Sequence, residues 1–273
     1  MSEVTYKTSE EIELIKKSSL LVSAALAEVA KVIAPGVTTL DLDKVADDFI
    51  TKNGGYPVFK GYQVYDQAYP FATCISVNEA VVHGLPNDYV IQDGDIISVD
   101  IGVKMNDFIG DSAYTFAVGN VKEEVLNLLR VTKQSLYLGI DQAKVNNRVG
   151  DIGFAVQSHC EGHGYSVVTE LVGHGVGREL HEDPQIPNYG RRGAGKKLQE
   201  GLVIAIEPMI NLGKKELGVA EDGWTYITKD GKASAHYEHT IALTKSGPVI
   251  LSDFSIVEKA ELSNKNLNTS YFA

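Results

Sequence analysis

The sequence predicts a mixed α/β protein built from two related halves that pack as one domain. Two observations support this: amphipathic helical segments alternate with β-rich runs, and one helix-and-turn pattern occurs twice. The 273 residues supply enough material for a substantial hydrophobic core. The composition, 44% hydrophobic and 22% charged, is that of an ordinary globular protein.

The N-terminal part is expected to form two helices. A capping box at residues 8–11 opens the first helix, and a Pro-Gly pair at 35–36 ends it. A second helix should begin near Thr38 or Thr39 and end at the Gly pair 54–55.

The middle of the chain changes to runs with the length and composition of strands. These runs are CISVN (74–78), DIISVDIGV (95–103), DSAYTFAVG (111–119), VIAIEPMI (203–210) and HYEHTIALT (236–244). Helical periodicity returns at 123–143 and, more briefly, at 151–161.

The repeat pairs the segment after Asp41 with the segment after Asp151. Each begins a short helix that closes on a glycine-rich turn before Tyr56 or Tyr165, and a longer helix precedes each. We therefore expect a single domain, 1–273, with halves at about 1–120 and 121–260. The polar tail 263–273 should be frayed.

Charge and cysteine content exclude several classes of protein. A net charge of −11 argues against a broad nucleic-acid footprint. The chain has no apolar run of membrane-spanning length and no secretory signal pattern. Two cysteines in a chain of this length favour a reducing, cytoplasmic location over a disulfide scaffold.

Two carboxylates flank the turn of a predicted hairpin. With the turn centred near Met105-Asn106, Asp100 and Asp111 would lie directly opposite each other, about 5 Å apart at Cβ. Opposed like charges destabilise a sheet unless a cation neutralises them. In a lone hairpin, a tolerated surface pair is the alternative interpretation.

Other acidic and imidazole side chains shift the balance toward a metal site. His174 lies among glycines, His181 follows it, Glu207 ends an apolar strand, and Glu238 lies within one. Any one of these could be a hydrogen-bonded core residue. Together, the four carboxylates would balance two divalent cations. Oxygen-rich ligation with one imidazole suits Mn, Fe or Co, with Zn possible.

At this point the sequence resembles a known family. CISVNEAVVHGLP, SVDIG…IGDSA, GHGVGRELHEDP, IEPMI and YEHT occur in the order and spacing of the type I methionine aminopeptidases, over about residues 5–255. The resemblance implies the pita-bread fold, with two pseudo-two-fold-related halves around a curved antiparallel sheet and helices on its outer face. It implies removal of N-terminal methionine from nascent polypeptides by a cytoplasmic monomer with two divalent ions. Docking on the ribosome is a further hypothesis.

The resemblance also implies metal ligands. Asp100 resembles a bidentate ligand of one ion, Asp111 and Glu238 resemble bridging carboxylates, and His174 and Glu207 resemble ligands of the other ion.

Three residues resemble catalytic groups of the family. His83 would lie beside the scissile residue, and His181 would donate to the carbonyl oxygen or the developing oxyanion. Glu207 would carry a proton from water to the leaving amine.

The methionine pocket needs apolar, polarisable side chains. The candidates are Cys74, Trp224 and the aromatic residues Tyr62, Tyr65, Tyr69 and Phe71. The alternative is that these aromatic residues only pack a long loop.

Strand periodicity predicts a second subsite. Because side chains two apart share a face, Met209 should point with Glu207, and His236 with Glu238. We expect both to border the subsite for the second substrate residue, where their bulk favours small side chains.

Two other functions remain possible: an Xaa-Pro aminopeptidase or dipeptidase of the same fold, and a metal-free binding homologue. All five ligand positions are present, which disfavours the binding homologue. Glu207 follows His181 by only 26 positions, which favours a type I enzyme over type II.

Overall fold

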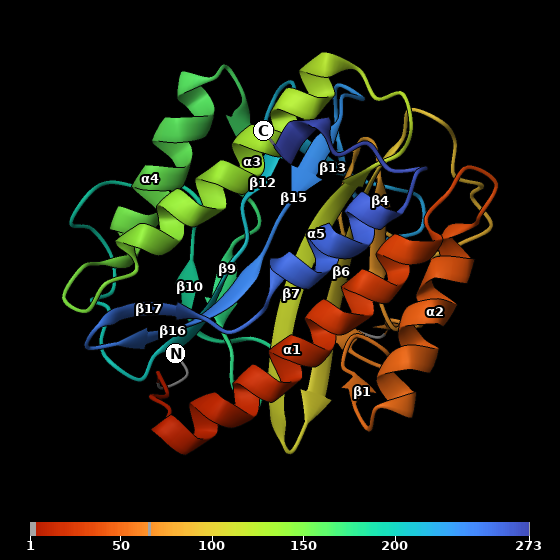
Figure 1. Cartoon of the computed structure of the whole chain (residues 1–273). Coiled ribbons are helices and arrows are strands. Elements are labelled where there is room, and N and C mark those ends of the chain that lie inside the picture. Colours follow the sequence, from red (N-terminus) through yellow and green to blue (C-terminus); the bar gives the residue numbers. More distant parts are fainter. Residues whose placement is uncertain (1–3, 65–66, 273) are drawn as a thin grey trace.

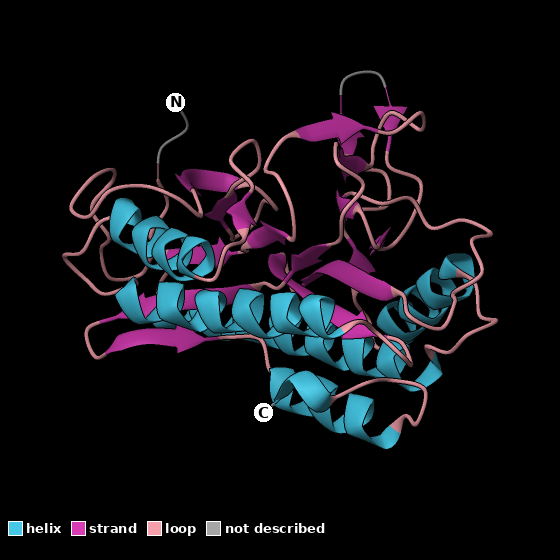
Figure 2. Cartoon of the chain, turned by 90° about the horizontal axis from the view of Figure 1, so that it is seen from above, coloured by secondary structure: helices cyan, strands magenta, loops and turns pink. Residues whose placement is uncertain are grey.

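The structure is a computed structural model and describes residues 4–64 and 67–272. The predicted pocket residue Tyr65 and the last tail residue, Ala273, lie outside these ranges. Helices gather on one side of the strands, and the opposite side carries loops and short strands (Figures 1 and 2). This arrangement confirms the predicted α/β architecture.

The helices in the described residues follow the predicted segments closely. They are α1 (Ser9–Val32), α2 (Thr39–Lys52), α3 (Glu123–Gln142), α4 (Val149–Gly162), α5 (Phe254–Ser263) and the 3-10 turn η1 (Ser270–Phe272). The first four confirm the predictions from sequence. Helix α5 was not predicted.

Capping explains where three of the helices begin. In α1 the Thr8 hydroxyl accepts from the backbone N–H of Glu11, and the Glu11 carboxylate accepts from that of Thr8. Thr38 and Asp41 form the same box at α2. At α4 the Asp151 carboxylate accepts from the backbone N–H of the preceding residue 148 at 2.8 Å. The shared caps of α2 and α4 agree with the predicted repeat.

The central hairpin joins β6 (Ile96–Met105) and β7 (Phe108–Ala117). Its turn lies at Asn106 and Asp107, which both have positive φ (53° and 65°), as two-residue hairpin loops require. Asp111 therefore lies opposite Gly102, and Asp100 opposite residue 113. The two carboxylates share a face, as expected, but the prediction that they lie directly opposite is wrong by two positions.

The remaining strands form antiparallel sheets around this hairpin. Strands β1 (Tyr56–Pro57) and β4 (Cys74–Val77) pair with different parts of β6 along the edge away from β7, β1 with residues 103–104 and β4 with residues 97–100. A five-stranded sheet contains, in spatial order, β10 (Glu182–Ile186), β9 (Gly173–Gly175), β11 (Val203–Ile206), β16 (His239–Thr244) and β17 (Gly247–Ile250). Smaller sheets contain β15 (Ser234–His236), β12 (Met209–Asn211) and β8 (Ser166–Val167); β13 (Leu217–Val219), β14 (Tyr226–Thr228) and β5 (Ala80–Val82); and β2 (Gln63–Val64) with β3 (Gln67–Ala68).

Two predicted strands are each divided into two. The run 203–210 breaks at Glu207-Pro208 into β11 and β12, and the run 236–244 breaks at Tyr237-Glu238 into β15 and β16. Proline has no N–H to donate to a ladder, which favours the first break. Each break lets the chain pass from one sheet to the next.

Hydroxyl side chains join the two halves where β7 runs beside β15 and β16. Ser112 Oγ donates to the carbonyl of Glu238 at 2.6 Å, and Thr115 Oγ1 donates to that of His236 at 2.7 Å. Thr240 Oγ1, from the other half, donates to the carbonyl of Asp111 at 2.7 Å. These bonds replace a regular strand ladder along this seam.

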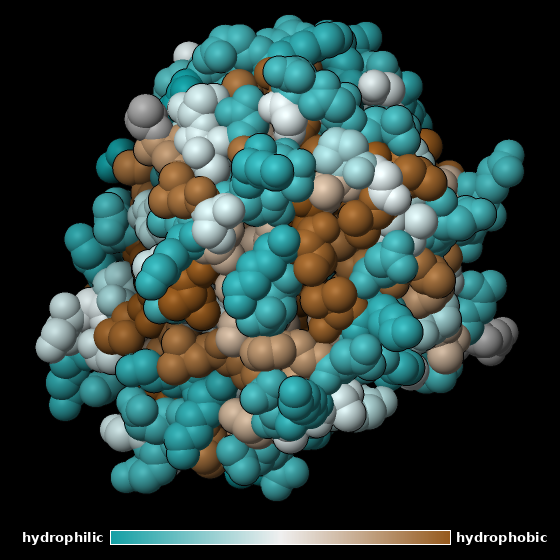
Figure 3. Space-filling model, turned by 45° about the vertical axis from the view of Figure 1, so that its right-hand side comes forward, coloured by the Kyte–Doolittle hydropathy of each residue, from teal (hydrophilic) through white to brown (hydrophobic). Residues whose placement is uncertain are grey.

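Helices α1 and α5 pack on the outer side of the hairpin, and α3 packs on α4 (Figure 1). On the face shown in Figure 3, hydrophobic patches are interrupted by polar side chains. Most large apolar side chains are instead buried in one core cluster, and most charged residues of this acidic chain remain at the surface.

The expectation of a frayed tail is wrong for its described residues, up to Phe272. Tyr271 is only 2% exposed, and Leu267 is also buried. The Tyr271 hydroxyl lies 2.7 Å from Glu261 Oε1 and 3.2 Å from the carbonyl oxygen of Thr115. Two apolar side chains in a polar stretch are therefore enough to fix this segment on the core.

Glu261 is a fully buried carboxyl group behind the hairpin. Its two oxygens accept hydrogen bonds from the hydroxyls of Tyr114 (2.9 Å) and Tyr271 (2.7 Å). Burial raises the pKa of Glu261 to about 7, although these hydrogen bonds and Lys133 act to lower it.

Replacing Glu261 with Gln should reduce the pH dependence of stability. The pKa of Glu261 is higher in the folded state than in the unfolded state, so its contribution is full below about pH 4.5 and is lost as pH rises through about 7. Between pH 5 and 8 the wild type should lose about 1–3 kcal/mol more than Glu261→Gln in the free energy of unfolding, measured with urea. The same pH dependence in both proteins would contradict this assignment.

Candidate metal centre

A cavity of about 700 Å³ lies between the two halves of the chain. Most of the predicted site residues line it. These are Tyr62, Tyr69, Cys74, His83, Asp100, Asp111, His174, His181, Glu207, Met209, Trp224 and Glu238. Phe71 and His236 do not line it: Phe71 packs edge-on against Tyr69, and His236 lies behind Glu207.

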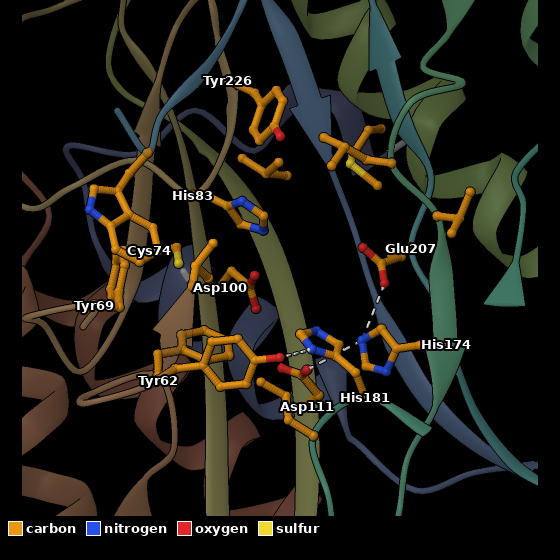
Figure 4. A pocket seen from close by; sticks show the side chains of 18 of the residues that line it. Tyr62, Tyr69, Cys74, His83, Asp100, Asp111, His174, His181, Glu207 and Tyr226 are labelled. Carbon is orange, nitrogen blue, oxygen red and sulfur yellow. Dashed lines mark hydrogen bonds and ion pairs between the residues drawn. The ribbon is translucent and has the colours of Figure 1, made fainter. Parts of the chain in front are cut away.

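The five predicted metal ligands come from five separate strands or strand ends. Asp100 is on β6, Asp111 on β7 and His174 on β9, whereas Glu207 and Glu238 occupy the two strand breaks. Figure 4 shows the labelled members of this set pointing into a common space.

Distances place three of the ligands in one cluster and a fourth beside it. One ligand atom from each of Asp111, His174 and Glu238 lies within 4.8 Å of the others. Nε2 of His174 is 3.5 Å from Glu207 Oε1 and 3.8 Å from Asp111 Oδ2. Asp111, His174 and Glu238 are therefore close enough to share a cation, and Glu207 lies next to His174.

The local structure fixes the tautomer of His174. Its Nδ1 lies 2.9 Å from the carbonyl oxygen of Gly175. Because a carbonyl can only accept, Nδ1 carries the proton and Nε2 presents a lone pair to the carboxylates. Burial lowers the pKa of His174 to about 3, which keeps the ring neutral.

The glycines beside His174 have a steric role. A Cβ at Gly173 would lie 2.4 Å from the carbonyl oxygen of Ala205, and one at Gly175 would lie 2.6 Å from that of Asp183. Only glycine lets β9 approach its neighbours this closely, so the motif positions the imidazole through backbone packing.

The carboxylates of the site lack cationic partners. Asp100 Oδ1, Asp111 Oδ1 and Glu238 Oε1 are buried without a hydrogen-bond partner, and no Lys or Arg within residues 4–64 and 67–272 forms an ion pair with them. Burial raises the pKa of Asp111 to about 7. Burial, together with neighbouring carboxylates, raises the pKa values of Asp100 and Glu238 well above the usual range. Divalent cations fit this donor set, because they would satisfy the orphaned oxygens and compensate the charge.

Two histidines lie on different sides of the cavity (Figure 4). His83 has a positive φ of 58° and packs edge-on against Tyr226, and burial lowers its pKa to about 4. The His181 ring packs edge-on against His174, with centroids 4.4 Å apart, and its Nδ1 is 2.7 Å from the Tyr62 hydroxyl.

The other end of the cavity is apolar and rigidly built. Cys74 is buried and lies opposite Asp100 in the β4–β6 ladder. The Tyr69 hydroxyl donates to the carbonyls of residues 73 and 84, each at 2.9 Å. The Trp224 ring packs edge-on against Tyr69 at 5.2 Å between centroids.

Sequence patterns missed some cavity residues. Tyr226 faces the cavity beside His83 because β14 pairs with β5, and Leu171 lines it from the loop before β9. No local signal links either residue to the site.

The two residues predicted for the second subsite, Met209 and His236, are cross-strand partners in the β12–β15 pair, and His236 Nε2 is 3.9 Å from Glu207 Oε2.

Comparison with known proteins agrees with this geometry. Residues 13–245 match metallopeptidase family M24. The chain is 47% identical to a methionine aminopeptidase of Clostridium perfringens, over 91% of this chain and 98% of that protein. It is also 47% identical to methionine aminopeptidase 1 of Bacillus subtilis, over 90% of this chain and 98% of that one.

Solved structures give the same result. A methionine aminopeptidase of Thermotoga maritima superposes with a TM-score of 0.89 at 46% identity, covering 92% of this chain and all of that chain. A prolidase of Pyrococcus furiosus shares the fold alone, with a TM-score of 0.74 at 23% identity, over 91% of this chain and 65% of that chain. The chain belongs to metallopeptidase family M24 and, within it, to the methionine aminopeptidases.

Proposed function

We propose that this chain hydrolyses the first peptide bond of nascent polypeptides that begin with methionine. The observation that carries the proposal is the convergence of four carboxylates and one neutral imidazole at the inner end of a cavity whose other end is apolar. Relatives named methionine aminopeptidase, at 47% identity over nine-tenths of the chain, support the same activity.

Two divalent cations would occupy the inner end. Asp100, Asp111, His174, Glu207 and Glu238 would hold these ions. When bound, the ions supply Lewis acidity to a carbonyl and lower the pKa of water. The donor set suits Mn, Fe or Co, with Zn possible.

Three side chains would handle the substrate and its protons. Glu207 would pass a proton from water to the leaving amine, because its carboxylate reaches into the cavity beside His174. His181 would donate to the scissile carbonyl oxygen. His83, on another side of the cavity, would lie beside the residue being removed.

The methionine side chain would occupy the apolar end. Cys74, Tyr69 and Trp224 line this end, and Phe71 supports Tyr69 from behind. A thioether packs favourably against aromatic edges and sulfur, and the hydrogen bonds of Tyr69 fix the wall it would contact.

The rival functions are weaker. An Xaa-Pro peptidase would use the same ligands, but the solved prolidase resembles this chain at only 23% identity, half the value of the methionine enzymes. A metal-free binding protein would have no use for a cluster of uncompensated carboxylates at the base of its cavity.

We also propose how the chain is organised and where it acts. Its two halves, about 1–120 and 121–260, would form one catalytic domain spanning 1–273 and act as a monomer, because both halves supply ligands to one cavity. Both cysteines are free and buried, which suits a reducing cytoplasm. Among the described residues, no helix has the length and apolar character needed to cross a bilayer.

Release of methionine from short peptides tests the proposed function. Metal-stripped protein reloaded with Mn or Co should cleave Met-Gly-Met-Met and Met-Ala-Ser, and the stripped protein should not, because the carboxylates alone cannot activate water. An Ala-Pro peptide is the control and should remain intact. Cleavage of Ala-Pro alone, or no cleavage with any metal, would sink the proposal.

Widening the region around Met209 and His236 should relax selection at the second substrate residue. Met209 is 1% exposed and lines the cavity, and His236 supports it across the β12–β15 pair. In a Met209→Ala, His236→Ser variant, the kcat/KM ratio of Met-Leu to Met-Ala peptides should rise about 10-fold or more. This ratio of kcat/KM values does not depend on the fraction of protein that is folded. Met105→Ala, at the hairpin tip, is the control and should leave the ratio unchanged. An unchanged ratio would show that these residues do not border the subsite.

We further propose that the enzyme docks on the ribosome through the basic segment 191–197. Its four cations, Arg191, Arg192, Lys196 and Lys197, are all exposed in a chain of net charge −11. Co-sedimentation with ribosomes should weaken as salt rises and should weaken further in a Lys196→Ala, Lys197→Ala variant. A Lys259→Ala, Lys265→Ala variant removes the same charge elsewhere on the surface. Salt-insensitive or absent association would refute docking.

A further inference from the structure

The backbone that carries His181 is held by a network around Glu182. Glu182 Oε1 accepts from the backbone N–H groups of Arg178 (2.9 Å) and Glu179 (3.4 Å). Its other oxygen pairs with Lys7, which is 8% exposed and comes from the N-terminal segment. Leu180, next to His181, is buried and lines the cavity. The position of His181 is therefore fixed, but these contacts do not fix the rotation or tautomer of its ring.

Among the described residues, Tyr62 makes the hydrogen bond to the His181 ring that can select its tautomer. Its hydroxyl lies 2.7 Å from Nδ1 of His181, and the two rings meet edge-on with centroids 5.3 Å apart. The His174 ring packs edge-on against His181 at 4.4 Å. Figure 4 shows the imidazole held between Tyr62 and His174, at the edge of the space that the carboxylates enter.

The direction of this hydrogen bond decides what His181 can do. A neutral imidazole carries one proton, on either Nδ1 or Nε2. If Tyr62 donates to Nδ1, the proton must be on Nε2, which is then a donor. If Nδ1 donates to Tyr62, Nε2 is only an acceptor and cannot bind a carbonyl oxygen.

The described contacts favour donation by Tyr62. Within residues 4–64 and 67–272, Nδ1 of His181 is the one hydrogen-bonding atom that the Tyr62 hydroxyl contacts, so donation to Nδ1 is the use of its hydrogen that these residues offer; the Tyr62 side chain is otherwise 37% exposed. Nε2 of His181 has no hydrogen-bond partner in the same residues, although the ring lines the cavity. A donor on Nε2 would thus be free for a substrate oxygen.

We propose that Tyr62 is a positioning residue that holds His181 as the Nε2–H tautomer, with this N–H directed at the carbonyl oxygen of the scissile bond. The proposal rests on the proposed function, in which His181 donates to that oxygen. It assigns a role to a side chain from the loop before β2, 119 residues away in sequence, for which the sequence offered either a place in the methionine pocket or packing of a long loop.

Nitrogen NMR of the histidine rings tests the tautomer without any measurement of activity. In the wild type, the ¹⁵N shifts of His181 should show Nδ1 unprotonated and Nε2 protonated. A His181→Ala variant identifies the signals by their loss. In Tyr62→Phe the His181 signals should move toward a mixture of tautomers, and the signals of the other six histidines should stay in place, which shows that the fold is intact.

Tyr56→Phe is the matched control. Tyr56 is 57% exposed, does not line the cavity, and donates its hydroxyl to the carbonyl of Lys60 at 3.0 Å in the same loop. The Tyr56→Phe variant also loses one tyrosine hydroxyl, but Tyr56 makes no contact with His181. The His181 signals of this variant should therefore match those of the wild type. A protonated Nδ1 in the wild type, or His181 signals unchanged in Tyr62→Phe, would overturn the proposal.

Kinetics then separate positioning from general support of the loop. Tyr62→Phe should lower kcat about 10-fold, as loss of an orienting partner does, with KM nearly unchanged. His181→Ala should cost about 10²–10³ in kcat, and adding Tyr62→Phe to it should cost nothing more, because Tyr62 acts through His181. An equal loss from Tyr62→Phe in both backgrounds would refute this role. Failure of the wild type to release methionine would instead refute the proposed function, and the NMR result would still decide the tautomer.

Discussion

The structure depends on one electrostatic constraint: four carboxylates meet at the base of a cavity with no basic side chain from the described residues paired to them. Burying like charges together is costly, and the raised pKa values of Asp100, Asp111 and Glu238 are the sign of that cost. A protein that needed only stability would not retain such a cluster. Its geometry is that of a site completed by cations, with the neutral imidazole of His174 supplying the one nitrogen donor.

Neither half of the chain could build this cluster alone. Asp100 and Asp111 stand on one long hairpin, and Glu207 and Glu238 occupy breaks between short strands of the other half. The hydroxyl groups of Ser112, Thr115 and Thr240 donate hydrogen bonds to backbone carbonyls of the opposite half, beside these breaks. The strand breaks therefore shape the cavity: each break turns a carboxylate into it, and side-chain bonds replace the ladder that the break removes.

The sequence predicted what local chemistry determines. A capping box marked the start of α1, and the ligand residues stood out because acids in apolar runs are unusual. The hairpin register was missed by two positions because Asn106 and Asp107, both able to adopt positive φ, form the turn instead of Met105-Asn106. The packing of Tyr271 against Thr115 and the Tyr62–His181 contact depend on residues distant in sequence, which no local pattern encodes.

The most direct test of this account is the number of metal ions that the chain binds. Protein dialysed against Mn²⁺ and analysed for metal should hold two ions per chain, because four carboxylates and one imidazole balance the charge of two divalent cations. Asp100→Asn should lose one of the two, and Asp107→Asn, at the exposed hairpin turn, should lose neither. A wild type that binds one ion or none would contradict the dinuclear site on which the proposed function rests. An Asp100→Asn variant that still binds two ions would contradict the role of Asp100 in that site.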